Sequence, residues 1–257
     1  MNPKSYRIKV SGLLIFFASF SIIPVAEGSE LAPIQTSDAP QVNEEPSQSI
    51  RSSNTTPSPD DRVAQLWEDE AELPPRKKCT ANHLQGNFWI TAQHCIGDNK
   101  LVPRFIRQLD GDTAKVKSVY TKSETVDIAL LKVEDGVKSA SFSLPDRSLS
   151  PGDRATLVGY GGSHDYPSVA QAQVEKYYNS FSFGEIKYSN ILGTVALDDS
   201  WSCHGDSGGA IYSDDTIYAV HTAGGGNPTC ADRKGGKMWH SDIFPHVDWI
   251  DSIIGNS

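Results

Sequence analysis

The heptapeptide CHGDSGG, residues 203–209, is the stretch that decides how this chain is interpreted. Ser207 stands among glycines, whose backbone adopts turns and positive φ angles that other residues resist. Such a turn exposes the serine side chain and lets the N–H groups of Gly205 and Ser207 converge on one point, where they can bind an oxyanion. On its own the string can also be a plain turn between strands, so its meaning depends on the rest of the chain.

Two other segments supply the groups that a reactive serine needs: TAQHC at residues 91–95 and DIALLKV at residues 127–133. A serine hydroxyl is a weak nucleophile unless a neighbouring base takes its proton, and the imidazole of His94 titrates close to neutral pH. Asp127 would hold the second ring nitrogen and fix the tautomer. Read separately, the histidine is a packed core residue and the aspartate caps a strand. The order His, Asp, Ser with these flanks instead favours a catalytic triad.

From residue 63 onward the chain is a succession of short apolar runs separated by Gly, Pro and Asp turns. The runs are rich in Val, Ile, Tyr and Thr, which is typical of strands. The predicted strands are residues 88–92, 114–120, 127–133, 154–160, 169–178, 191–197, 209–212, 216–222 and 237–244. After Pro245, Val247, Ile250 and Ile254 recur at helical spacing. We therefore predict an all-β protein with one C-terminal helix.

The first 62 residues differ in composition from the rest. A basic start, an apolar run at residues 10–25 and small residues up to Gly28 predict a signal peptide over residues 1–28. The alternative is a membrane anchor, but the run contains Pro24 and is shorter than the roughly 20 residues that a spanning helix needs. Residues 29–62 are rich in Ser, Pro, Thr and Glu and predict a disordered pro-segment or linker. The folded domain is expected at residues 63–257, secreted to the periplasm or the extracellular space.

Charge and cysteine content indicate whether the chain binds nucleic acid and how its cysteines are used. The chain has 32 acidic and 23 basic residues, for a net charge of -9. A nucleic-acid-binding protein needs a basic face, so this balance argues against that class. Four cysteines in a secreted chain predict two disulfides, and spacing alone leaves all three pairings open. They are Cys79, Cys95, Cys203 and Cys230. They lack the close spacing of zinc ligands, and we expect no metal and no cofactor.

The three motifs together resemble the chymotrypsin/trypsin family of serine endopeptidases, from about Cys79 to the C-terminus. The resemblance implies two six-stranded antiparallel β-barrels with the site in the cleft between them. It implies that His94, Asp127 and Ser207 form the triad, with the N–H groups of Gly205 and Ser207 as the oxyanion hole. The expected activity is hydrolysis of protein or peptide substrates through an acyl-enzyme, by a monomer that is free of the membrane after signal cleavage.

The resemblance also implies the disulfide pairing, Cys79 with Cys95 and Cys203 with Cys230. The second of these bridges would flank the specificity pocket.

Activation is where the sequence departs from the family. Members usually expose a new Ile or Val amine, followed by Val-Gly-Gly, which pairs with the aspartate before the nucleophile. That aspartate is present as Asp206, but the Val-Gly-Gly string is absent. One hypothesis is a zymogen that an activating protease cleaves after Arg62, which frees Val63. The alternative is that Asp206 pairs within the chain, for example with Arg154.

The specificity pocket also departs from trypsin-like members. The residue six positions before the nucleophile is Trp201 rather than aspartate, so a preference for Lys or Arg has no support. His221 resembles the histidine with which bacterial glutamyl endopeptidases receive an acidic side chain, which suggests a bacterial-type member. Ser202 and Gly224 would complete the pocket. The alternative for His221 is a strand histidine satisfied by the backbone.

Two other functions compete with the protease. One is a binding protein that uses a catalytically inactive protease fold, which a missing triad residue would indicate. The other is a lipase-type esterase, which carries Gly-x-Ser-x-Gly and the order Ser, Asp, His. In this chain no triad residue is missing, and the order is His, Asp, Ser.

Overall fold

The computed structural model describes residues 56–68, 77–96, 105–162, 165–198, 200, 202–224 and 236–256. The predicted signal peptide, most of the segment 29–62, Trp201 and Cys230 lie outside this part of the chain. Among the described residues, no helix is long and apolar enough to cross a membrane.

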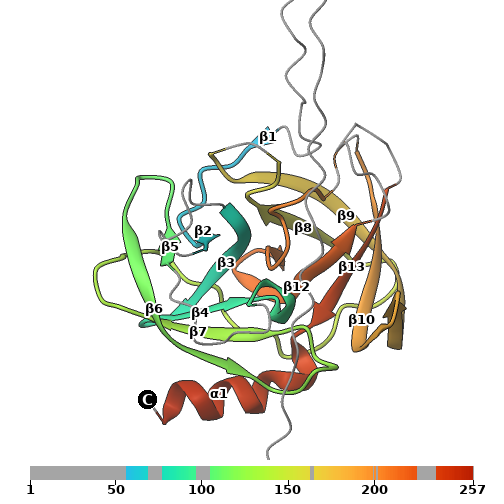
Figure 1. Ribbon diagram of the computed structural model, residues 1–257. Coiled ribbons are helices and arrows are strands. Elements are labelled where there is room, and N and C mark those ends of the chain that lie inside the picture. The colour runs from blue at the N-terminus through green and yellow to red at the C-terminus, as the bar shows by residue number, and fades with distance from the viewer. Residues whose placement is uncertain are drawn as a thin grey trace, which may run out of the picture. The chain divides into compact units, whose positions relative to one another are not determined.

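The first half of the domain is a closed antiparallel barrel (Figure 1). Its strands, in spatial order, are β2 (Val63–Trp67), β3 (Lys77–Gln85), β4 (Phe88–Thr91), β7 (Ala129–Val133), β6 (Thr113–Thr121) and β5 (Phe105–Arg107), and β5 pairs back with β2. Leu66, Trp89, Ile106 and Leu131 fill its interior. Burying apolar surface of this kind contributes about 25 cal/mol per Å² and holds the barrel together.

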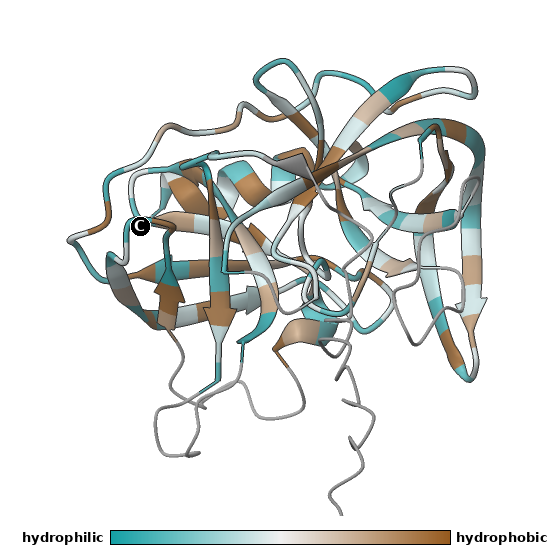
Figure 2. Cartoon of the chain, turned by 90° about the horizontal axis from the view of Figure 1, so that it is seen from above, coloured by the Kyte–Doolittle hydropathy of each residue, from teal (hydrophilic) through white to brown (hydrophobic). Residues whose placement is uncertain are grey.

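The second half is another ring of six antiparallel strands. These are β8 (Arg154–Gly159), β9 (Ser168–Phe183), β10 (Ile186–Ala196), β13 (Lys237–Asp242), β12 (Thr216–Gly224) and β11 (Ala210–Ser213). Strand β8 pairs with both β9 and β11, which closes the ring. Hydrophobic and hydrophilic residues alternate along many of the strands in Figure 2, as expected where one face of a sheet is buried.

A short strand precedes the first barrel and joins the second. Strand β1 (Thr56–Pro57) pairs with β9, and the Ser58 N–H donates to the Pro167 carbonyl at 2.9 Å. This strand lies within the segment 29–62, for which the sequence predicts disorder. Residues from Thr56 onward therefore belong structurally to the folded domain.

The chain ends in a 3₁₀ turn, η2 (Phe244–His246), and helix α1 (Val247–Gly255). Ile250 is fully buried, and Val247 and Ile254 pack beside it on a cluster to which both barrels contribute. The helix inferred from these three positions is confirmed, as is the architecture of two six-stranded barrels.

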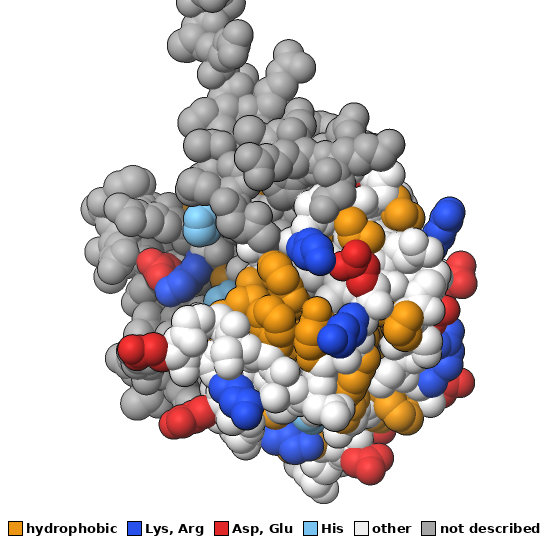
Figure 3. All heavy atoms as spheres, turned by 90° about the vertical axis from the view of Figure 1, so that its right-hand side faces the viewer, with side chains coloured by type: hydrophobic (Ala, Val, Ile, Leu, Met, Phe, Trp, Pro, Cys, Tyr) orange, Lys and Arg blue, Asp and Glu red, His pale blue; other side chains and the backbone are white. Residues whose placement is uncertain are grey.

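Half-buried aromatic side chains gather on the second barrel. Figure 3 shows hydrophobic side chains on the face where β9, β10 and β13 lie in Figure 1. Ring contacts between 4.9 and 6.1 Å join Tyr178, Phe181, Phe183, Tyr188 and Trp239. This packing supports the long β9–β10 hairpin.

Candidate active site

His94 and Asp127 come from adjacent strands of the first barrel. Strands β4 and β7 pair with Thr91 opposite Ala129. His94 lies in the 3₁₀ turn η1 (Gln93–Cys95) that follows β4, and Asp127 immediately precedes the buried residues that lead into β7. The pairing of these two strands therefore brings the histidine and the aspartate together.

The His94–Asp127 geometry is that of an oriented base. The Asp127 carboxylate is fully buried, and its Oδ2 lies 2.9 Å from His94 Nδ1. Its Oδ1 accepts the His94 backbone N–H at 2.9 Å. A carboxylate can only accept, so Nδ1 is the protonated nitrogen and Nε2 is left with a free lone pair. The imidazole is one third exposed, which keeps Nε2 accessible.

A disulfide holds this corner of the barrel. Cys79 in β3 is bonded to Cys95, 16 residues further along the chain. The ligand atoms of Cys79, His94 and Cys95 lie within 4.8 Å of one another. Both sulfurs are consumed by the disulfide, so this cluster is no metal site. Cys203 is also disulfide-bonded, and its predicted partner Cys230 lies outside the described residues.

The nucleophile loop depends on two glycines of positive φ. Gly205 has φ 102° and Gly208 has φ 79°. A Cβ at Gly205 would overlap the carbonyl oxygen of Tyr160, and one at Gly208 would overlap the carbonyl oxygen of Thr80. Only glycine fits these two positions, which explains the glycines two residues before and one residue after Ser207.

The first barrel holds this loop through β3. The Thr80 hydroxyl donates to the Gly205 carbonyl at 2.8 Å and accepts the Tyr160 N–H at 2.9 Å. The Thr80 N–H donates to the Ser207 carbonyl at 2.8 Å. The side-chain amide of Asn82 donates to the Gly208 carbonyl at 2.7 Å. Sequence reasoning missed both β3 residues, because polar side chains in a strand show no sign of what they bind.

Ser207 and His94 are thus fixed on neighbouring parts of the structure. Among the described residues, no hydrogen bond joins the Ser207 hydroxyl to His94 Nε2, and the contact of Nε2 is with Cys95 Sγ at 3.9 Å. Catalytic hydrogen bonds are often long in unliganded enzymes and tighten when substrate binds.

Asp206 is fully buried beneath the nucleophile loop. Its Oδ2 accepts the Cys203 N–H at 2.8 Å. Burial lowers the pKa of Lys77, and the negative charges of Asp206 and Asp165 oppose that shift. Arg154, the internal partner suggested by the sequence, is exposed on β8. Lys77 is therefore a cationic neighbour of Asp206 that the sequence did not indicate.

The structure brings two residues of the predicted specificity pocket, Ser202 and Gly224, into contact. Ser202 is buried, and a Cβ on Gly224 would overlap its hydroxyl. The Ser202 hydroxyl has no hydrogen-bond partner among the described residues. His221 precedes Gly224 in β12 and is 2 % exposed. Trp201, the predicted floor of the pocket, lies outside the described part.

His221 belongs to a buried pair of histidines. Its Nδ1 lies 3.1 Å from Nδ1 of His240 on β13, and His240 Nε2 lies 2.8 Å from the Thr194 hydroxyl. Burial lowers the pKa of His221 to about 3, and the charge of His94 acts in the same direction. Burial also lowers the pKa of His240. Both rings are therefore uncharged at neutral pH, and His221 is satisfied by a side chain rather than by the backbone.

The fold is that of a two-barrel β protein in which Asp127 binds His94 and strand β3 of the first barrel holds the loop that carries Ser207. Residues 34–250 match the family model described as Trypsin. The chain therefore belongs to the trypsin family of serine proteases.

Known proteins from animals show the same relationship. Human kallikrein-8 is 25% identical over 224 residues, which is 75% of this chain and 83% of the relative. The snake venom serine protease nikobin of Vipera nikolskii is 26% identical over 210 residues, 71% of this chain and 80% of the relative. A structure of kallikrein-related peptidase 10 in complex with Zn2+ matches with a TM-score of 0.60 and 17% identity, over 77% of this chain and 97% of that one. That structure supports the fold alone, and the bacterial-type assignment is not borne out.

Proposed function

We propose that this chain is a secreted serine endopeptidase that hydrolyses peptide bonds through an acyl-enzyme on Ser207. The observation that carries the proposal is the His94 imidazole, whose Nδ1 lies 2.9 Å from the buried Asp127 carboxylate in a member of the trypsin family. This imidazole is oriented by the carboxylate while one third of its side chain stays exposed, which supports a role in proton transfer.

The proposed mechanism gives each of these groups one role. His94 Nε2 takes the Ser207 hydroxyl proton as Oγ attacks the carbonyl carbon of the substrate. The oxyanion that forms accepts hydrogen bonds from the N–H groups of Gly205 and Ser207, each worth roughly 3 to 4 kcal/mol of barrier. His94 then gives its proton to the leaving amine. Water, deprotonated by His94, attacks the acyl-enzyme and releases the acid product with Ser207 restored.

Asp127 acts through His94. Its carboxylate fixes the tautomer with the proton on Nδ1 and stabilises the imidazolium that forms in each step. Its complete burial strengthens this interaction, because few water dipoles screen it.

Peptide hydrolysis by matched variants tests the proposal. Wild-type protein should cleave a mixed library of internally quenched peptides, and Ser207→Ala and His94→Ala should reduce cleavage by several orders of magnitude. Ser182→Ala, an exposed serine on β9, is the control and should retain full activity. Equal activity in the wild type and Ser207→Ala would refute the proposal.

For specificity we propose an acidic residue on the acyl side of the scissile bond, received by His221 and Ser202. A carboxylate that enters this pocket would favour the protonated form of the imidazole and so raise its pKa from the low value of the empty site. The unpartnered Ser202 hydroxyl could donate to the same carboxylate. On a peptide library, His221→Ala should abolish the preference, and an unchanged preference would show that this assignment is wrong.

The proposal includes synthesis as a precursor. Arg62 binds both oxygens of Asp60 and lies 4.2 Å above the Phe142 ring, and the next residue, Val63, is fully buried in β2. Cleavage after Arg62 must therefore break this set of contacts before Val63 is freed. N-terminal sequencing of the active, secreted protein distinguishes the routes. A start at Val63 supports the zymogen, whereas a start at Ser29 supports internal pairing of Asp206 and removal of the signal peptide alone.

The second candidate is a catalytically inactive binding protein on the same fold. It is favoured by the absence of a hydrogen bond between Ser207 and His94 in the described residues. This candidate predicts a folded, secreted protein in which neither peptides nor acylating probes react with Ser207.

A further inference from the structure

The loop of residues 123–126 leads directly to Asp127. It lies between β6 and β7 and belongs to neither strand, so no ladder of hydrogen bonds holds it in register. Its backbone forms a turn in which the Val126 N–H donates to the Ser123 carbonyl at 3.2 Å. The position of the Asp127 carboxylate therefore depends on the contacts that hold this turn against the rest of the barrel.

Gln93 binds the loop from the turn that carries His94. It directly precedes His94 in η1 and is half-buried. Its carboxamide nitrogen lies 2.8 Å from the Ser123 carbonyl oxygen and 2.8 Å from the Val126 carbonyl oxygen. Only the NH2 group of an amide can donate, and it carries two N–H bonds, so the orientation that satisfies both carbonyls directs this group at the loop. One side chain thus joins the residue before His94 to the residue before Asp127.

The second barrel binds the same loop through Ser189 of β10. The Ser189 N–H and hydroxyl both donate to the Thr125 carbonyl, at 2.8 and 3.0 Å. Thr125 lies two residues before Asp127. Donors from both barrels therefore hold the loop, and Gln93 supplies the two that come from the side of the histidine.

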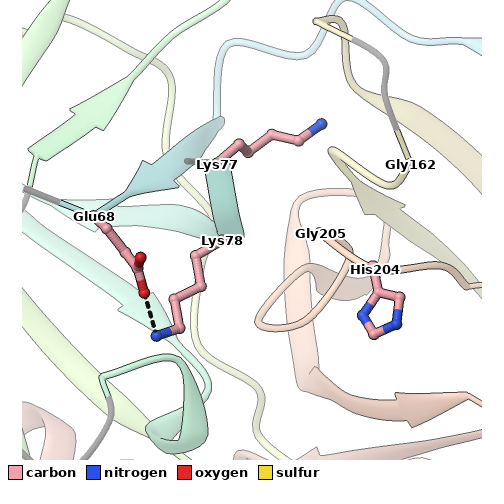
Figure 4. Close-up of a pocket in the computed structure, with 6 residues that line it drawn as sticks. All are labelled: Glu68, Lys77, Lys78, Gly162, His204 and Gly205. Carbon is pink, nitrogen blue, oxygen red and sulfur yellow. Dashed lines mark hydrogen bonds and ion pairs between the residues drawn. The ribbon is translucent and has the colours of Figure 1, made fainter. Parts of the chain in front are cut away.

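Gln93 does not line the cavity beside the nucleophile loop. That cavity measures about 310 Å³, and its described lining residues, which Figure 4 labels, come from the first barrel, from Gly162 and from the loop of Gly205. The NH2 group of Gln93 is taken up by the two carbonyls of the turn. An effect of Gln93 on activity would therefore act through His94 and Asp127.

We propose that Gln93 is a positioning residue for the His94–Asp127 pair. Its amide keeps the loop at the distance from η1 at which the buried Asp127 carboxylate meets both Nδ1 and the backbone N–H of His94. Without these two donors the loop can move away from η1, and the imidazole loses its fixed orientation. The inference rests on the proposed endopeptidase function, in which a misplaced base slows proton transfer.

The experiment compares wild type with Gln93→Met, which keeps the length of the side chain and removes both donors. On an internally quenched peptide, kcat should fall about tenfold and KM should change by less than about twofold, because the orientation of the base matters in the transition state and not for substrate binding. The second readout is the ¹H NMR signal of the His94 Nδ1 proton in the Ser207→Ala background, which prevents self-digestion. This proton bonds to a carboxylate, and in Gln93→Met its signal should move upfield or exchange faster with water.

Two controls separate positioning from a general loss of stability. Gln85→Met removes the same group at an exposed position of β3 and should leave both readouts unchanged. Ile106→Val weakens the interior of the same barrel, so it should lower Tm and leave kcat and the proton signal unchanged. If Gln93→Met does not fold, Gln93→Asn carries the test, because its shorter amide reaches at most one carbonyl and should produce smaller changes in the same direction.

The contrary outcomes keep this inference apart from the proposed function. Wild-type kcat and a wild-type proton signal in Gln93→Met overturn the inference and show that the turn and Ser189 hold the loop by themselves. A fall in kcat that Ile106→Val matches overturns it as well. A wild type that cleaves no peptide overturns the proposed function, and the proton signal alone then decides whether Gln93 positions His94 against Asp127.

Discussion

Replacing Thr80 by valine should damage both stability and activity, although the two side chains have nearly the same shape. The Thr80 hydroxyl is fully buried and serves two backbone groups, the Gly205 carbonyl and the Tyr160 N–H. Thr80→Val leaves both without this partner. An unsatisfied buried polar group costs about 1 to 3 kcal/mol, so we expect a loss of roughly 2 to 4 kcal/mol in the free energy of unfolding.

For a domain of this size, each kcal/mol lowers Tm by about 2 to 4 °C. Calorimetry in a Ser207→Ala background, which prevents self-digestion, should therefore show a decrease of roughly 5 to 15 °C. In the active background, kcat/KM should fall at least about tenfold, because Gly205 no longer holds its N–H in place. Thr113→Val, at an exposed position of β6, is the matched control. A Thr80→Val protein as stable and as active as the control would refute the claim that β3 positions the nucleophile loop.

Three further changes have defined outcomes. Burial raises the pKa of Asp242 to about 6, above the ordinary value near 4, so its contribution to stability is present below about pH 4 and lost as pH rises through 6. The difference in unfolding free energy between the wild type and Asp242→Asn, measured in urea, should consequently fall by up to about 3 kcal/mol from pH 4 to pH 7. Gly208→Ala should prevent folding or lower Tm sharply, since its Cβ overlaps backbone atoms, whereas Gly184→Ala, with nothing within 4 Å, should show only mild strain. Removing the Cys79–Cys95 bridge by a double alanine substitution should cost about 3 kcal/mol for a loop of this length in urea unfolding, and no change would show that the bridge is not stabilising.

Strands with regular apolar patterns could be predicted from the sequence. All nine predicted strands occur, and the largest boundary differences are in the β9–β10 hairpin. The hairpin extends beyond the predicted runs because its aromatic residues pack on Trp239 of β13, a contact between distant segments.

Strand β3, which matters most for the site, could not be predicted. It reads KKCTANHLQ, and polar residues in its middle hide the pattern of a buried strand. Thr80 and Asn82 are buried because they bind the nucleophile loop of the other barrel. Hydrophobic periodicity is a property of one segment, so it does not indicate hydrogen-bond partners that lie more than a hundred residues away in the sequence.

The residues of the candidate site also fall into two groups, those that the sequence indicated and those that it did not. His94 and Asp127 could be recognised because local motifs set their roles, and the structure brings them into contact. His240 and Lys77 could not, because their importance comes from burial beside His221 and from proximity to Asp206. These contacts arise only after the strands have assembled.

Labelling with a fluorophosphonate probe tests the central claim most directly. The probe acylates only a serine activated by a base, so the secreted full-length protein should become labelled, with the adduct on Ser207 by mass spectrometry. Ser207→Ala should take up no label, and Asp127→Asn should react about 10⁴-fold more slowly. Absence of label on a wild-type protein with a normal cooperative unfolding transition would contradict the claim that His94, Asp127 and Ser207 act together as a catalytic triad.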